Sequence, residues 1–334
     1  MKLRHPPSTQ LLRPLLDMYR SSAVALTGCR SLGLERGSCE FDVIVVTPEK
    51  RPPRSTRVSG VHVDLYFIDE KEVMRPSNPE HAVSMANAIA VKDASLVLST
   101  SFASNSALLA NSSRRSSRAR LGSSLKALGR VDDALSKGLV PDADFWLLSA
   151  SYDFAYALLY SRERMPAPSH LLGQLKSQSK GLAKNFEAFS RGAGLEKASR
   201  ASCSARLEAL EVLHDVLGRA QGGGGASHSA WTKERLDIVR SKAAELSRLI
   251  DHAEAYSFLG QEVLKALMAI AWREESEGKR RAKSPMLMSV LAAEKEGLLS
   301  ARLLRELGIP RQKASVEGSL VLLRDHVSRL EKWV

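Results

Sequence analysis

Three acidic residues occupy regular positions on two predicted strands near the start of the chain. Glu40 and Asp42 open the apolar run Phe41–Val46, and Asp64 lies within the alternating run Val61–Ile68. Alternate side chains of a strand share one face, so Glu40 and Asp42 should point the same way, roughly 6–7 Å apart along the chain. If the two strands are neighbours, about 4.8 Å apart, all three carboxylates converge on one face of a sheet.

Three converging carboxylates repel one another unless a cation holds them. Hard divalent ions with oxygen ligands, Mg²⁺ in particular, are the usual partners of such a group. Two ions about 3.5–4 Å apart would form a clamp for phosphoryl or nucleotidyl transfer. Solvated acids at the ends of strands are the alternative, and they would need no metal.

A glycine turn upstream of the acids favours the metal interpretation. The run "GCRSLGLERGSCEFDVIVV" begins at Gly28, directly after the short predicted strand in "SAVALTG". It resembles the DNA polymerase β-like nucleotidyltransferase superfamily. In that motif a strand ends in a glycine turn, a short helix follows, two acids alternate with apolar residues on the next strand, and a third acid lies on a later strand. Glu40 and Asp42 match the first two acids, and "HVDLYF" supplies Asp64. The resemblance covers about residues 20–70 and weakens toward residue 110.

The resemblance implies an activity and a set of residues. The reaction would move a nucleoside monophosphate from an NTP, expected to be ATP, to an acceptor hydroxyl with two Mg²⁺ ions and release of pyrophosphate. Glu40, Asp42 and Asp64 would be the catalytic metal ligands, and Asp64 could also act as the base. The turn would bind the nucleotide through Gly28, Cys29 and Arg30.

Two departures from the motif leave an alternative open. Cys29 stands where serine or glycine is usual, and a thiol is a weak hydrogen-bond donor. Glu40 replaces the more common aspartate and lengthens that arm by one methylene. The alternative is a non-catalytic nucleotide- or RNA-binding protein with a degenerate nucleotidyltransferase site.

The predicted elements place this motif in an α+β protein. Strands are expected at "SAVALTG", "FDVIVV" and "VHVDLYFI", while the two prolines of "RPPRSTRVSG" indicate a turn-rich loop. "PEHAVSMANAIAVKD" has helical spacing, and "SLVLSTS" is a candidate short strand. Beyond Ser104 only helical patterns follow. We therefore expect a small mixed-sheet nucleotidyltransferase domain followed by an all-helical region.

Changes in composition suggest three domains. The nucleotidyltransferase domain would cover residues 1–110, a helical domain residues 111–220, and a C-terminal helical region residues 221–334. "QGGGGASHS", residues 221–229, is the clearest linker because consecutive glycines give the backbone the greatest freedom.

The chain is strongly basic, with a formal net charge of +12. A basic surplus favours polyanionic partners. The most basic local stretch, residues 114–130, contains Arg114, Arg115, Arg118, Arg120, Lys126 and Arg130. It could hold the unknown acceptor, an RNA or a protein, or it could be a solvated connector.

Several other classes of protein are disfavoured by the sequence. No apolar run approaches the ~20 residues of a membrane span, and the N-terminus does not resemble a secretory signal. The three cysteines match no zinc site, so we expect a cytoplasmic protein without membrane partners. Gly28 and Gly33 have the spacing of a phosphate-binding Walker A loop, but Leu34 and Glu35 stand where lysine and serine or threonine belong.

Overall fold

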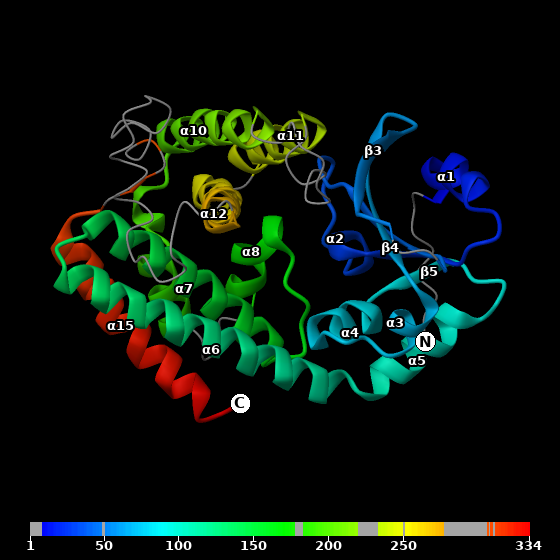
Figure 1. Cartoon of the computed structure of the whole chain (residues 1–334), viewed down its shortest axis with the longest axis horizontal. Helices are drawn as coiled ribbons and strands as arrows, with labels where there is room; N and C mark the ends of the chain where they lie inside the picture. The colour runs from blue at the N-terminus through cyan, green and yellow to red at the C-terminus, as the bar shows by residue number, and fades with distance from the viewer. Residues whose placement is uncertain are drawn as a thin grey trace. The chain divides into compact units, whose positions relative to one another are not determined.

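The computed structural model describes residues 9–48, 51–177, 183–219, 233–249, 251–276, 306, 308–309 and 311–334. Its contacts divide the chain into two units. Unit 1 comprises Met1–Ser116, Arg162–Ala167 and Gly224–Lys242, and unit 2 comprises Ser117–Ser161, Pro168–Gly223 and Ala243–Val334. The expected α+β class is confirmed, because a mixed sheet in the N-terminal part is followed by helices (Figure 1).

Unit 1 is built on a five-stranded sheet with the order β3-β4-β2-β1-β5. Its strands are β1 (Val24–Thr27), β2 (Phe41–Val46), β3 (Arg54–Val58), β4 (Val61–Ile68) and β5 (Ile89–Lys92). The central pair β2 and β4 is parallel, whereas the other three pairs are antiparallel. The parallel pair fixes the positions of the acids, because its register pairs β2 from Phe41 with β4 from Val63, residue by residue.

Alternating side chains of the sheet enter two separate cores. The helices η1 (Thr9–Leu12) and α1 (Arg13–Met18) contribute Leu12 and Leu15 to a cluster with Leu26, Phe41, Val43, Val63 and Leu65. On the other face Ala25 and Ile44 pack with Val73, Met85 and Leu98. These three residues come from α3 (Glu70–Met74), α4 (Pro79–Ala86) and α5 (Val97–Ala107). Asp42 has the same strand parity as Ile44, so it belongs to the face covered by these three helices.

The loop expected at "RPPRSTRVSG" is wrong, since Arg54–Val58 forms the edge strand β3. Both prolines lie before the strand, where their missing N–H groups remove no ladder hydrogen bond. The polar side chains of β3 are largely accessible to solvent, which is why the segment lacks the apolar alternation of a predicted strand.

Two further expectations in unit 1 need correction. The candidate strand "SLVLSTS" is the start of α5, because the carboxylate of Asp93 accepts hydrogen bonds from the backbone N–H groups of Leu98 and Ser99. The helix expected over residues 79–93 ends at Ala86, and Ile89–Lys92 pairs with β1 as β5. A helix cap overrides the local pattern in the first case, and pairing with β1 overrides it in the second.

The expectation of helices after Ser104 is confirmed for the residues that the structure describes. The helices after α5 are α6 (Leu109–Ser136), α7 (Val140–Tyr160), η2 (Pro168–His170), α8 (Leu171–Lys176), α9 (Ala183–Gly192), η3 (Leu195–Lys197), α10 (Arg200–Arg219), α11 (Lys233–Leu249), α12 (His252–Ser276) and α15 (Lys313–Glu331). In unit 2, α10 packs against α12, and α15 packs against α7 and α9. Aromatic side chains from three of these helices, Phe145, Phe154, Phe189 and Tyr256, are fully buried.

Unit 1 takes in two segments from later in the chain, residues 162–167 and residues 224–242. The linker predicted at residues 221–229 lies outside the described residues, so the boundary there stays a prediction, as does the boundary at residue 110. Within the described part of the chain, no helix has the length and apolar character that a bilayer crossing requires.

Candidate functional site

The parallel register of β2 and β4 brings the three predicted acids together. Asp42 lies directly opposite Asp64, and Glu40 immediately precedes β2. One carboxylate oxygen from each residue lies within 4.8 Å of the other two. Glu40 and Asp64 are only 6% and 8% exposed, while Asp42 is partly exposed. The predicted convergence of the three carboxylates is therefore confirmed.

Two neighbouring hydroxyl groups orient the aspartates. Ser55 of β3 donates a hydrogen bond to Oδ1 of Asp64 at 2.6 Å, and the Tyr66 hydroxyl donates to Oδ1 of Asp42 at 3.4 Å. The sequence did not single out either residue. Tyr66 could have been found, because it follows Asp64 by two positions and shares its strand face. Ser55 could not, because its strand was interpreted as a loop.

Glycine is the residue type that fits position 28, in the turn before the acids. Its φ is +71°, in the left-handed region that L side chains rarely adopt. A Cβ atom added there would collide with the carboxylate of Asp42. Gly28, the first residue of α2 (Gly28–Ser31) directly after β1, therefore lies against one of the acids, a contact that the sequence did not predict.

Cys29 and Arg30 lie beside the acids but face other groups. Cys29 is buried in a cluster with Cys39 and Ala167, and its hydrogen bond with Cys39, together with burial, raises the pKa of its thiol. The Arg30 guanidinium donates to the backbone oxygens of Glu40 and Cys39 at 3.1 and 2.5 Å. It also stacks on the ring of Phe41, 4.0 Å from the centroid. Arg30 thus fixes the chain that carries Glu40, and a role in nucleotide binding stays a prediction for both residues.

Two cations from the part of α11 that belongs to unit 1 complete the cluster. Arg235 Nη1 lies 3.4 Å from Asp64 Oδ2 and 3.7 Å from Glu40 Oε1. Lys242 Nζ forms an ion pair with Glu40 Oε2, and both side chains of that pair are almost completely buried. Sequence reasoning missed both residues because 171 positions separate Arg235 from Asp64, and no local pattern links them.

The surroundings of Glu40 and Asp42 shift the pKa values of these two acids in opposite directions. Burial alone would raise the pKa of Glu40, but the charges of Lys242 and Arg235 outweigh it and lower that pKa. Burial, and then repulsion from Glu40, raises the pKa of Asp42 to about 8. Without a further cation, the surroundings therefore favour the ionised form of Glu40 and the neutral form of Asp42.

The donor set fits a hard divalent cation. Three carboxylates with oxygens within 4.8 Å of one another offer only oxygen ligands, the type that Mg²⁺ prefers. A cation bound there would also favour ionised Asp42, because opposite charge lowers the pKa of a carboxyl group. Glu40, Asp42 and Asp64 are the residues that could hold such an ion.

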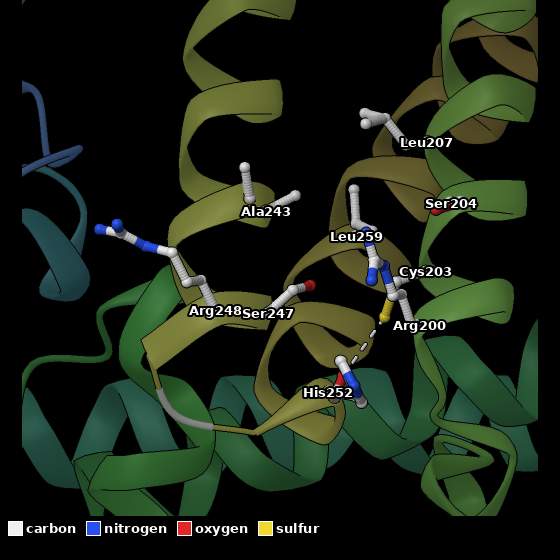
Figure 2. A pocket seen from close by; sticks show the side chains of 10 residues that line it. Arg200, Cys203, Ser204, Leu207, Ala243, Ser247, Arg248, His252 and Leu259 are labelled. Carbon is white, nitrogen blue, oxygen red and sulfur yellow. Dashed lines mark hydrogen bonds between the residues drawn. The ribbon is translucent and has the colours of Figure 1, made fainter.

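Unit 2 contains a separate cavity of about 550 Å³, lined by residues of α10, α11 and α12 (Figure 2). The Cys203 thiol faces it and donates to the backbone oxygen of His252 at 3.4 Å. Burial raises the pKa of Cys203, so this thiol is not an activated nucleophile. Arg248 points away from Cys203 and His252 in Figure 2. The lining residues thus assemble no reactive group comparable with the acids of unit 1.

Fold and site together define an α+β protein with a carboxylate cluster at the start of a parallel strand pair. Compared with known proteins, the chain matches no family model and none of the curated proteins. The geometry of its own residues is therefore the basis for any functional assignment.

Proposed function

We propose that the protein is a Mg²⁺-dependent nucleotidyltransferase. One observation carries the proposal: the parallel pairing of Asp42 with Asp64, which together with Glu40 brings three carboxylates within 4.8 Å. Such a cluster is costly unless cations neutralise it. The glycine at the end of β1 adds to this argument, because the resemblance to nucleotidyltransferases places a glycine turn there and Gly28 packs against Asp42.

In the proposed reaction, the oxygen of an acceptor hydroxyl forms a bond to the α-phosphorus of an NTP. The bond between that phosphorus and the oxygen bridging to the β-phosphate breaks, and pyrophosphate leaves. Glu40, Asp42 and Asp64 would hold Mg²⁺, which would stabilise the charge that develops on the phosphate oxygens. Asp64, oriented by Ser55, would accept the proton of the hydroxyl. Tyr66 would orient Asp42.

The acceptor is proposed from the basic segment of α6. Arg114, Arg115, Arg118 and Lys126 are exposed and lie along one helix, whereas Arg120 pairs with Asp153 at 2.9 Å. A row of exposed cations suits an RNA backbone. A protein acceptor is the other outcome of the test below.

Pyrophosphate release tests the proposal. The chain is incubated with Mg²⁺, each of the four NTPs in turn, and cell extract as a source of acceptors. Asp42→Asn and Asp64→Asn should each lower turnover on the order of a hundredfold, because metal-assisted charge stabilisation supplies several kcal/mol. Asp17→Asn, which removes an exposed acid of unit 1, is the matched control and should leave turnover unchanged.

A second candidate is favoured by the ion pairs of Arg235 and Lys242, which offset the charges of Glu40 and Asp64 without any metal. It is a non-catalytic nucleotide- or RNA-binding protein with a degenerate site. Absence of both pyrophosphate release and thermal stabilisation by Mg²⁺-NTP, for all four nucleotides, would leave this candidate in place of the enzyme.

A further inference from the structure

Burying the two cations of the acid cluster costs hydration free energy, and this cost needs an explanation. The side chains of Lys242 and Glu40 are 6% and 8% exposed, so both charges have lost most of their water. Buried ion pairs often stabilise a protein no more than apolar residues of the same volume would. Arg235 approaches the same carboxylates at 3.4 and 3.7 Å. Their presence on the residues that would hold Mg²⁺ indicates a second task.

The charge of the metal-bound site points to that task. With all three carboxylates ionised, Arg235 and Lys242 leave one negative charge in the cluster. Two Mg²⁺ ions would turn this into an excess of three positive charges. A triphosphate carries about four negative charges at neutral pH, since the last pKa of a phosphate group is about 6. Metal and triphosphate together would bring this fully ionised cluster back to one negative charge. The two cations are therefore compatible with bound metal when a polyphosphate accompanies it.

We propose that Arg235 and Lys242 bind the phosphate groups of the incoming nucleotide and rest on Glu40 and Asp64 until it arrives. The inference rests on the proposed function, because it adds two binding residues to the same site. Arginine is suited to such an exchange, since its planar guanidinium donates equally well to carboxylate and to phosphate oxygens. Lysine supplies a compact charge with three donors.

A purely structural role is the competing explanation. In that case the ion pairs only attach α11 to the sheet, and phosphate affinity would not depend on them. The two explanations differ in what a neutral side chain does to ligand binding. Loss of an attachment lowers stability alone, whereas loss of a phosphate ligand weakens polyphosphate binding in a chain that remains folded.

The test uses Arg235→Gln in the full-length chain, with Arg240→Gln as the matched control. Arg240 lies on the same part of α11 and also forms an ion pair at 3.4 Å, but with Asp237. Calorimetry measures the binding of Mg²⁺ alone and of tripolyphosphate in the presence of Mg²⁺. Arg235→Gln should weaken tripolyphosphate binding roughly tenfold to a hundredfold, the range for a charged hydrogen bond. It should leave Mg²⁺ affinity unchanged or raise it, and Arg240→Gln should match the wild type.

Lys242→Gln is measured in the same way and should have an effect of the same size. If it does not fold, because it leaves Glu40 buried with one partner fewer, Arg235→Gln decides alone. Tripolyphosphate binding that is absent in the wild type, or equal in Arg235→Gln and Arg240→Gln, overturns the inference.

Tripolyphosphate also separates this inference from the proposed function. A chain that binds it through Arg235 and Lys242, but releases no pyrophosphate from any NTP, keeps the inference and loses nucleotidyl transfer. Nucleotide transfer that is equally fast in Arg235→Gln and in the wild type would keep the proposed function and overturn the inference.

Discussion

Replacing Gly28 by alanine tests whether the turn and Asp42 are built as one unit. The glycine has a φ of +71°, and an added Cβ would collide with the Asp42 carboxylate. Gly60 provides a matched control in unit 1, since its φ is +80° but no atom lies within 4 Å of an added Cβ. Gly60→Ala therefore carries backbone strain alone, whereas Gly28→Ala carries strain and a collision.

The magnitudes follow from these two contributions. An alanine in the left-handed region costs about 1–2 kcal/mol, which is the expected loss of stability for Gly60→Ala. Overpacking adds about 1–3 kcal/mol, so Gly28→Ala should cost about 2–5 kcal/mol. In an Asp42→Ala background most of the colliding atoms are absent, and Gly28→Ala should then cost no more than Gly60→Ala.

Native-state hydrogen exchange at the amides of β2 and β4 measures the free energy of opening of unit 1 directly. Thermal stabilisation by Mg²⁺ is recorded for the same proteins, and Gly28→Ala should lose it because the displaced Asp42 is a proposed metal ligand. Equal costs for Gly28→Ala and Gly60→Ala would refute the reasoning. So would an extra cost that persists after Asp42 is replaced by alanine.

Three further changes test other features. Asp93→Ala should destabilise α5 by about 1 kcal/mol, as measured by hydrogen exchange, because it removes a cap. Burial would raise the pKa of Asp93, but hydrogen bonds from Ser99 and Leu98 outweigh it and lower that pKa. The extra stability of the wild type over Asp93→Ala should therefore be present above pH ~3.9 and disappear as the pH falls through the lowered pKa. Extra stability that remains at pH 2 would contradict this. Arg311→Met should cost about 3–5 kcal/mol in urea unfolding, since it removes the guanidinium that pairs with the buried Asp144 carboxylate at 2.6 Å and leaves only the backbone N–H of residue 311 donating to it. Asp144→Leu with Arg311→Met should recover part of that loss, because the Arg191 and Gly192 carbonyls still lack their donor. A single change no worse than the double would count against it. Changing Arg114, Arg115 and Arg118 to serine should reduce the slope of log affinity for RNA against log salt concentration by roughly 0.7 for each phosphate that is no longer neutralised. Arg120→Ser should leave this slope unchanged, because Arg120 is paired with Asp153. An unchanged slope in the triple variant would make the segment a connector.

The parts of the site that sequence could predict are those with a local periodic signal. Phe41–Val46 and Val61–Ile68 are recognisable as strands from β-branched residues and alternation, and their boundaries agree with β2 and β4. Placing the three acids on one face then needed only the assumption that these strands are neighbours, whereas the parallel register that sets Asp42 opposite Asp64 was not predicted.

The parts that could not be predicted depend on contacts distant in sequence. The polar edge strand β3 takes its conformation from pairing with β4, so Ser55 was not recognised as a partner of Asp64. Arg235 and Lys242 lie on an ordinary charged helix, and nothing in their neighbourhood distinguishes them from Arg240. Cation partners of this kind are visible only once the chain is folded.

Arg235 and Lys242 are synthesised long after the acids that they pair with, which has a consequence for the nascent chain. Asp64 and Arg235 are 171 residues apart. At about 5–20 residues per second, the ribosome needs roughly 10–30 s to make the intervening chain. During that interval the nascent sheet holds its carboxylates without the basic side chains that balance them in the finished protein. A fragment released before residue 235 would carry the same three acids without Arg235 and Lys242. The stability of such a fragment would show how well the sheet tolerates its carboxylates when these cations are missing.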